Sequence, residues 1–376
     1  MGSRRKVIII GSAWPLRGGG IATFNERLAK AYMDNGFDVI IYSFSLQYPS
    51  FLFPGTSQYT TEPAPKGINI RTRINSINPF NWIKVGKEIA RQKPDLVVVR
   101  FWIPFMGPSL GTISGILKKN KIKVVAIVDN IIPHEHSLID RPLSAYFVKR
   151  VDGFVTMSKS VLNDLNGFDK TKTKLLAVHP LYDNFGKIIP KQDALKSLNL
   201  PSDFKYLLFF GFIREYKGLD ILLKAFSDKR LNELPLKLIV AGEFYIDKKP
   251  YLELIDELGI SENVIMHNEF IPNAKVVNYF CAASVVVQPY KDATQSGITQ
   301  VAYHFEKPII TTNVGGLSEI VIDGRDGYVV EPDEKKLADA LFMFFANDKE
   351  KEFEFNVKED KKRFSWDNLL SAIEKV

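Results

Sequence analysis

The residues from 285 to 319 constrain the fold of this chain most strongly; their sequence is VVVQPYKDATQSGITQVAYHFEKPIITTNVGGLSE. The apolar run at the start predicts a buried strand that ends at Pro289, and Ile309 to Thr312 predicts a second strand. A small polar loop and a helix-like segment, Ile298 to Phe305, lie between them. Strand, loop, helix and strand in this order are typical of a doubly wound α/β domain, where a helix start offers backbone N–H groups to a phosphate. An ordinary loop of an α/β sheet is the alternative.

The start of the chain has the same order of elements. A predicted strand, Ile8 to Ile10, is followed by a glycine-rich loop with Gly18-Gly19-Gly20, a predicted helix from Ile21 to Gly36 and a predicted strand from Asp38 to Tyr42. The glycines allow a ligand to approach the backbone closely. Their spacing is not G-x-G-x-x-G, and no acidic residue follows the second strand at the usual place, so a dinucleotide cofactor is disfavoured.

A chain of 376 residues is long enough for two domains. We expect a first Rossmann-like domain over 1–185, a second Rossmann-like domain over 186–358, and a C-terminal helix over 359–376 that packs back toward the first domain. Residues 44–79 are aromatic and rich in Pro and Gly, which predicts a long packed loop that lines an acceptor site or touches lipid. The apolar stretch 96–117 contains Arg100, Pro104 and Pro108, which favours a strand and a buried helix over a membrane span.

Charge is distributed unevenly along the chain. Residues 1–185 contain 25 Lys and Arg against 13 Asp and Glu, and the remainder contains 25 against 30. The basic half indicates an anionic partner, either an anionic membrane or a phosphate-bearing substrate, or else a solvated basic face. No nucleic-acid-binding module accompanies it, so we expect no nucleic acid. The single cysteine, Cys281, suits a reducing compartment, and the N-terminal apolar run is too short for a signal peptide. We therefore expect a cytoplasmic protein, with the inner face of the cell membrane as an open location.

The motifs together resemble the retaining GT-B glycosyltransferases of the group 1, family 4-like type. Two motifs that support the resemblance are the first glycine loop and G-x-x-x-x-x-K-G at 211–218. A third is the spacing of that family's P-S-x-x-E-G-F-G-x-x-x-x-E-A-M-A-x-G-x-P pattern over Pro289 to Pro308. The fourth is T-x-V-G-G-x-x-E, which ends at Glu319. The resemblance implies two Rossmann-like domains facing across a cleft, with the acceptor on the domain over 1–185 and the nucleotide-sugar donor on the domain over 186–358. It also implies transfer of a sugar from a nucleotide diphosphate sugar to an acceptor hydroxyl, with retention, in bacterial surface polysaccharide or glycolipid biosynthesis. The acceptor would be a carbohydrate or a lipid-linked saccharide.

The sequence departs from the family pattern in the donor site. The family's paired glutamates fall on Ala293 and Val301, and a Thr-Gln-Ser-Gly variant begins at Thr294. The family's arginine falls on Phe212, and we expect Arg214 to replace it, with Lys217 neutralising the diphosphate. The donor-binding residues that the resemblance implies are Gly19, Gly20, Arg214, Lys217, Glu243, Gln295, Ser296, Gly297, Ile298, Thr299 and Gln300.

The resemblance implies a catalytic set of His134, Arg214 and Lys217, with His134 touching the donor sugar or the phosphate. A metal site at His134-Glu135-His136 has little support from its spacing, and a structural histidine stays open. Glu243 and Glu269 follow predicted strands of the second domain, where base or ribose contacts and loop salt bridges are equally compatible. The sequence contains no D-x-D, so we expect neither a metal nor another cofactor.

Two other functions stay open. A nucleotide-sugar epimerase of the same fold would convert its substrate without an acceptor. A non-catalytic nucleotide-sugar-binding protein is compatible with the loss of both family glutamates.

Overall fold

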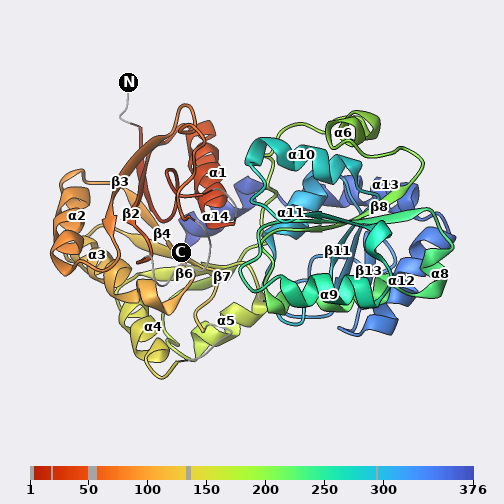
Figure 1. Ribbon diagram of the computed structural model, residues 1–376. Coiled ribbons are helices and arrows are strands. Elements are labelled where there is room, and N and C mark those ends of the chain that lie inside the picture. Colours follow the sequence, from red (N-terminus) through yellow and green to blue (C-terminus); the bar gives the residue numbers. More distant parts are fainter. Residues whose placement is uncertain (1–3, 18–19, 50–56, 133–136, 294) are drawn as a thin grey trace. The chain divides into compact units, whose positions relative to one another are not determined.

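The computed structural model describes residues 4–17, 20–49, 57–132, 137–293 and 295–376. These residues form two compact units. Unit 1 comprises residues 1–180 and 365–376, and unit 2 comprises residues 181–364. Each unit has a parallel sheet with helices on both of its faces (Figure 1).

The sheet of unit 1 has seven strands in the order β3-β2-β1-β4-β5-β6-β7. Their bounds are β1 Lys6–Ile10, β2 Asp38–Leu46, β3 Asn69–Asn75, β4 Leu96–Phe101, β5 Val124–Val128, β6 Gly153–Thr156 and β7 Lys174–Leu176. At its centre, Ile8 pairs with Ile40 on one side and with Val97 on the other. The central strands are almost continuously apolar because helices cover both faces of a parallel sheet.

The helices of unit 1 connect these strands. They are α1 Ile21–Asp34, α2 Pro79–Arg91, η2 Pro104–Met106, α3 Gly107–Lys119, α4 Asp140–Val148, α5 Lys159–Asn166 and α14 Trp366–Lys375. Helix α2 packs against α3, and α3 packs against α4. The C-terminal helix α14 packs against α1, where the rings of Trp366 and Phe24 lie 5.0 Å apart (Figure 1).

The sheet of unit 2 has six strands in the order β10-β9-β8-β11-β12-β13. They are β8 Lys205–Phe210, β9 Leu236–Ala241, β10 Val264–His267, β11 Val285–Gln288, β12 Ile309–Thr312 and β13 Gly327–Val330. The helices are α6 Lys191–Ser197, η3 Glu215–Lys217, α7 Leu219–Phe226, α8 Lys229–Asn232, α9 Lys249–Glu257, η4 Ser261–Asn263, α10 Asn273–Ala282, α11 Gly297–His304, α12 Glu334–Ala346, α13 Glu350–Asp360 and η5 Lys361–Arg363.

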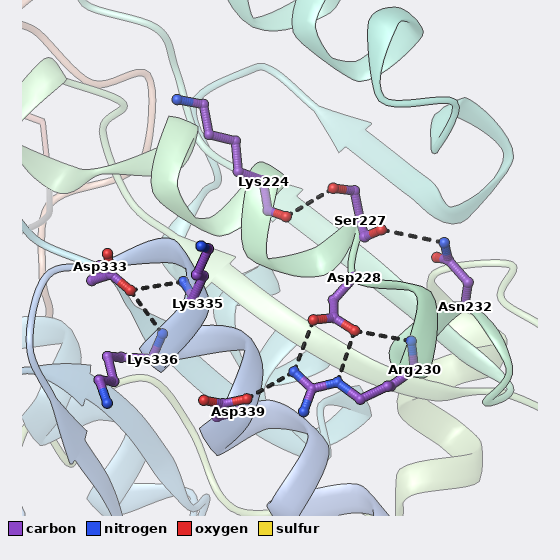
Figure 2. Close-up of polar contacts among 9 residues, drawn as sticks. All are labelled: Lys224, Ser227, Asp228, Arg230, Asn232, Asp333, Lys335, Lys336 and Asp339. Carbon is purple, nitrogen blue, oxygen red and sulfur yellow. Dashed lines mark hydrogen bonds and ion pairs between the residues drawn. The ribbon is translucent and has the colours of Figure 1, made fainter.

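Aspartate caps fix the starts of two of these helices, as Figure 2 shows. Asp228 accepts a hydrogen bond from the backbone N–H of Arg230 at the start of α8, and Asp333 accepts from those of Lys335 and Lys336 in α12. The guanidinium of Arg230 also donates to Asp339, which ties α8 to α12. Such caps satisfy N–H groups that have no partner inside the helix.

The predicted long loop over residues 44–79 is wrong in part. Strand β2 continues to Leu46, and β3 pairs with it in parallel as the edge strand of the sheet. The sequence of β3, NIRTRIN, is polar because an edge strand is only partly covered, so its composition resembled that of a loop. Tyr48 is packed as expected, since the indole of Trp102 donates to its hydroxyl at 2.8 Å. Residues 50–56 of this segment lie outside the described residues.

The prediction for 96–117 is confirmed, since the segment forms β4, η2 and most of α3. Among the described residues, no helix has the length and apolar character needed to cross a membrane.

Candidate functional site

In each sheet, one pair of neighbouring strands marks the point where the strand order reverses. The pair is β1 and β4 in unit 1, and β8 and β11 in unit 2. Ligands of open α/β sheets bind at the carboxyl ends of the strands at such a switch point. Each unit therefore contains one place where a substrate is expected.

At the switch point of unit 2, the chain after β8 holds Lys217, which is buried at 8% exposure. Gly211 has φ +104°, and a Cβ built there would lie 3.0 Å from the Lys217 Nζ and 3.5 Å from the Ile298 side chain. The glycine therefore leaves room for the ammonium group beside the start of α11. The Lys217 Nζ lies 5.3 Å from the ring centre of Tyr290.

The charge of Lys217 is not balanced by a carboxylate within the described residues. Burial disfavours the charged form, but the contacts with Tyr290 and Tyr216 raise the pKa of Lys217 above its ordinary value, so its ammonium is charged at neutral pH. The neighbouring Arg214 adds a second positive charge. The site therefore combines a buried ammonium with an exposed guanidinium, and these two positive charges favour an anion.

Helix α11 begins opposite this loop, and its first turn is held by Gln288 at the end of β11. Ser296 is the N-cap and accepts from the backbone N–H of Ile298 at 3.3 Å. The Gln288 Nε2 donates to the Ser296 Oγ at 2.8 Å, and the Thr299 Oγ1 donates to the Gln288 Oε1 at 2.9 Å. Ser296 and Thr299 thus use their side chains to position the start of α11. Gly297 lies against Tyr182, since a Cβ there would come within 2.8 Å of the tyrosine ring.

The two glutamines of the predicted donor set have amide atoms without partners. Gln300 is fully buried, and within the described chain neither its Nε2 nor its Oε1 has a hydrogen-bond partner. The Nε2 of Gln295 is also unpartnered among these residues. Buried polar atoms of this kind need a ligand or water to satisfy them.

Close backbone packing joins the two sides of this site. A Cβ at Gly218 would lie 1.9 Å from the carbonyl oxygen of Pro289, so only glycine fits there. The backbone N–H of Lys291 donates to the carbonyl of Tyr216 at 2.7 Å, and its Nζ forms an ion pair with Asp220 at 2.9 Å. These contacts fix the loop that carries Lys217 relative to the end of β11.

Three aromatic rings follow three neighbouring strands of unit 2. Phe212 comes after β8, Tyr245 after β9 and Phe270 after β10. The ring centres of Phe212 and Tyr245 lie 4.5 Å apart, and those of Phe212 and Phe270 lie 6.2 Å apart. Arg214 is exposed, and its guanidinium lies 5.1 Å from the ring centre of Tyr245. The planes of Phe212 and Tyr245 are inclined by 31° and those of Phe212 and Phe270 by 25°, so Phe212 stacks with both other rings. The three rings are half-buried.

Glu243 is placed at the same edge, directly after β9. It is 8% exposed, and its carbonyl accepts from the backbone N–H of Ile213 at 2.8 Å. Gly242 before it has φ +151°, and a Cβ there would lie 2.1 Å from the carbonyl oxygen of Gly211. Glu269 lies near His267, and burial lowers the pKa of that histidine while Glu269 opposes the shift.

A separate pocket of about 550 Å³ in unit 2 does not contain Lys217 or the start of α11. Five of its lining residues are acidic: Glu215, Asp220, Asp247, Glu253 and Glu257. Their charge disfavours a diphosphate, so this pocket is not the donor site.

The switch point of unit 1 also holds a buried cation, Arg100, which is 3% exposed. Its Nε donates to the Asp129 carboxylate at 2.5 Å, and its Nη2 donates to the other carboxylate oxygen. The guanidinium lies 3.8 Å from the ring centre of Phe24. Gly11 leaves space for Asn25 and Arg100, since a Cβ there would lie 2.5 Å from the Asn25 Nδ2 and 3.1 Å from the Arg100 Cβ. Burial raises the pKa of Asp129, and Arg100 opposes the shift.

The remaining predicted residues of unit 1 are only partly described. Gly20 is the N-cap of α1 and has φ +51°, a conformation that favours glycine. Gly19 and His134 lie outside the described residues, so their predicted roles stay predictions. Across the described ranges, no cluster of three or more His, Cys, Asp or Glu has the arrangement of a metal site.

Two family models match adjacent parts of the chain. The glycosyltransferase family 4 model matches residues 18–183, and the model of glycosyl transferases group 1 matches residues 190–361. The chain belongs to the group 1 glycosyltransferases. An uncharacterized glycosyltransferase of Methanocaldococcus jannaschii is 26% identical to it over 95% of this chain and 94% of the relative. A D-inositol 3-phosphate glycosyltransferase of Thermobifida fusca is also 26% identical, over 83% of this chain and 77% of the relative.

Solved structures show that this glycosyltransferase has the GT-B fold. Anabaena HepE in complex with UDP and glucose matches it with a TM-score of 0.73 and 15% identity, over 99% of this chain and 98% of that one. Sucrose-phosphate synthase from Thermosynechococcus elongatus matches with a TM-score of 0.70 and 17% identity, over 99% and 97%. At these identities the likeness concerns the fold alone.

Three features of this glycosyltransferase were not predicted from its sequence: Gln288, Tyr290 and the Arg100–Asp129 pair. The stacking of Phe212 with two other rings was not predicted either. Gln288 ends a predicted apolar strand, where a polar residue at the carboxyl edge was the available signal. Arg100 and Asp129 are 29 residues apart, and only the adjacency of β4 and β5 brings them together.

Proposed function

We propose that this glycosyltransferase transfers a sugar from a nucleotide diphosphate sugar to an acceptor hydroxyl, with retention of the anomeric configuration. The observation that carries the proposal is the buried Lys217 ammonium at the switch point of unit 2, with no carboxylate partner among the described residues. A buried charge without a counter-ion is costly. A bound diphosphate supplies the missing negative charge.

In this proposal the diphosphate lies between Lys217 and the start of α11. The positive end of the helix dipole attracts the anion. Lys217 and Arg214 stabilise the charge that develops on the diphosphate as the bond to the sugar breaks. The leaving diphosphate accepts the proton of the acceptor hydroxyl. These two cations take the place of a divalent metal, so EDTA is expected to leave turnover unchanged.

We assign the nucleoside of the donor to the half-buried stack of Phe212, Tyr245 and Phe270, since a base stacks on aromatic rings. Anabaena HepE, which has the same fold, binds UDP and glucose. UDP-sugars are therefore the first donors to test.

The acceptor is assigned to unit 1, which carries 26 Lys and Arg against 14 Asp and Glu. A basic surface of this kind suits a carbohydrate or lipid-linked saccharide presented at an anionic membrane, as in bacterial surface polysaccharide or glycolipid biosynthesis. We assign the protein to the cytoplasm, at the inner face of the cell membrane. The relatives named as D-inositol 3-phosphate glycosyltransferases support a polyol or sugar hydroxyl as the nucleophile.

The test is a panel of UDP-, GDP-, ADP- and TDP-sugars. Thermal shifts identify the donor that binds. The product formed with an acceptor is then examined by NMR for its anomeric configuration. The proposal expects acceptor-dependent transfer with retention. Conversion of the donor without an acceptor would identify an epimerase, and binding without any turnover would identify a binding protein; both contradict the proposal.

A substitution of Arg214 tests whether its charge supports turnover without disturbing the fold. Arg214 is exposed, so Arg214→Ala is expected to fold normally and to lose most of its turnover with the identified donor, because a cation beside the diphosphate is gone. Arg214→Lys is expected to recover part of that turnover. Full activity in Arg214→Ala would remove this residue from the site.

A further inference from the structure

Five large exposed apolar side chains of unit 1 lie at the starts of two helices. Leu138 and Ile139 precede α4 and are 98% and 64% exposed. Ile77, Phe80 and Ile83 lie at the start of α2 and are 51%, 85% and 42% exposed. Single exposed apolar residues are ordinary, but five large ones grouped in this way mark an interaction surface.

The topology places both groups at the same edge of the sheet. Strands β3, β4, β5 and β6 are parallel, so each connecting helix begins where the preceding strand ends. Helix α3 packs between α2 and α4, and all three begin at the carboxyl edge (Figure 1). We call Ile77, Phe80, Ile83, Leu138 and Ile139 the apolar rim. The rim lies at the edge of unit 1 that also carries Arg100 and Asp129.

Cations adjoin the apolar rim. The outer face of α2 continues from Phe80 and Ile83 with Lys84, Lys87 and Arg91, all of them exposed. The helix has one acidic residue, Glu88, which is half-buried and accepts a hydrogen bond from the Tyr42 hydroxyl at 2.8 Å. Arg71 lies 3.8 Å from the same carboxylate. The carboxylate of Glu88 is therefore paired within the unit, and the exposed face of α2 is apolar and positively charged.

We propose that the apolar rim and the outer face of α2 form a docking surface for an anionic lipid bilayer. Large apolar side chains next to lysine and arginine are typical of helices that lie at a membrane surface, where the apolar groups enter the interface and the cations attract lipid headgroups. The rim consists of protruding helix starts, which a fluid interface accommodates without a matching concave partner. The proposal rests on the proposed function only in taking the acceptor to be a membrane lipid.

The experiment is sedimentation of the full chain with vesicles, without donor or acceptor. Vesicles of phosphatidylcholine alone are compared with vesicles that also contain phosphatidylglycerol, at low and high salt. The wild type is expected to bind the anionic vesicles at low salt. Phe80→Glu with Leu138→Glu is expected to weaken binding by more than roughly tenfold, and Lys84→Glu with Lys87→Glu to weaken it and reduce its dependence on salt.

A matched control lies in unit 2. Phe355 is 64% exposed on α13 and is flanked there by two lysines, Lys351 and Lys358, and two glutamates, Glu352 and Glu359. This surface has no excess of positive charge, so Phe355→Glu is expected to bind vesicles like the wild type. The rim variants are expected to keep the donor-induced thermal shift and turnover of a soluble acceptor, so this test and that of the proposed function fail separately. The proposal is overturned if the wild type ignores anionic vesicles at low salt, if the Phe80 and Leu138 variant binds as well as the wild type, or if Phe355→Glu weakens binding equally.

Discussion

Each unit has a buried cation at the switch point of its sheet, and the two units differ in whether that cation has a carboxylate partner. In each unit a glycine after the first strand lies beside a buried cation, Gly11 beside Arg100 and Gly211 beside Lys217. In unit 1 the cation is neutralised by Asp129 through two hydrogen bonds. In unit 2 no carboxylate of the described chain pairs with the cation.

This difference distinguishes Arg100, a cation paired within the protein, from Lys217, a cation that can pair with a bound substrate. A buried cation that already has a carboxylate partner gains less from a further anion than a buried cation without a carboxylate. This contrast is the basis for our proposal that the donor diphosphate binds to unit 2 and the acceptor hydroxyl to unit 1.

The comparison is tested most severely by Lys217→Met. We expect turnover to fall by roughly a hundredfold or more, because the charge that stabilises the leaving diphosphate is lost. We expect the melting temperature to stay within a few degrees of the wild type, since Met fills the same space without an unpaired charge. Donor turnover and thermal melting measure the two effects.

Lys307 provides the matched control in the same unit. It is buried at 7% exposure, but its Nζ is paired with Glu354 at 2.6 Å. Lys307→Met is expected to keep its turnover. Equal losses of turnover in both variants would show that burial of a lysine, and not the absence of a partner, explains the effect of Lys217.

Asp129→Ala is expected to act on stability. It leaves the guanidinium of Arg100 buried beside Phe24 without its counter-ion, which costs about 3–5 kcal/mol in the free energy of unfolding. Urea-induced unfolding measures the loss. Replacing both partners, with Arg100→Met and Asp129→Leu, is expected to restore much of the stability. An unchanged stability in Asp129→Ala would mean that the pair is not structural.

His179 is expected to make the free energy of unfolding of unit 1 depend on pH, which adds to the comparison between the two units. Burial, together with Arg100, lowers the pKa of His179 to about 3, while its hydrogen bond with the Pro180 carbonyl opposes the shift. The unfolded chain therefore binds the proton first, so the contribution of His179 is complete above about pH 6.5 and is lost as the pH falls toward 3.

The measurement is the free energy of unfolding between these pH values for the wild type and for His179→Gln. The variant is expected to lose part of the acid sensitivity. In unit 2 the half-buried His267 has a pKa lowered by burial and partly restored by Glu269, so His267→Gln is expected to change the slope less. An identical slope in the wild type and His179→Gln would contradict a buried neutral histidine.

Ser296→Ala is expected to have the smallest effect. Loss of the N-cap costs about 1 kcal/mol, and a weaker hold on the start of α11 lowers donor affinity severalfold. Ser158 caps α5 in unit 1, where it accepts from the backbone N–H of Val161 at 3.3 Å, so Ser158→Ala is a matched cap deletion. It is expected to lose similar stability and to keep its donor affinity, as measured by titration calorimetry. Equal losses of affinity would mean that the cap of α11 has no particular role in the site.

The predictable parts of the site are those that lie close together in sequence. Gly211 and Lys217 belong to one short loop, and Ser296 to Thr299 belong to one helix start, so local patterns and the family resemblance were enough to find them. The order of strands and helices followed from apolar periodicity in most of the chain. Strand β3 was missed because its polar edge sequence lacks that periodicity.

The remaining parts depend on pairing between distant segments. The Gln288 side chain lies at the end of β11, and its bonds to Ser296 and Thr299 appear only when α11 folds back over that strand. Asp129 reaches Arg100 because β4 and β5 are neighbours in register, with Arg100 opposite Ile127. A local sequence pattern does not show whether a buried cation has a carboxylate partner, and the two switch points differ in this respect.

The most direct test of the central claim is titration calorimetry of the wild type and Lys217→Met with the nucleoside diphosphate of the identified donor and with the matching nucleoside. The wild type is expected to bind the diphosphate more tightly than the nucleoside by roughly a hundredfold, and Lys217→Met to lose most of that difference while it still binds the nucleoside. Equal preference for the diphosphate in both proteins would show that the unpaired cation of unit 2 does not hold it.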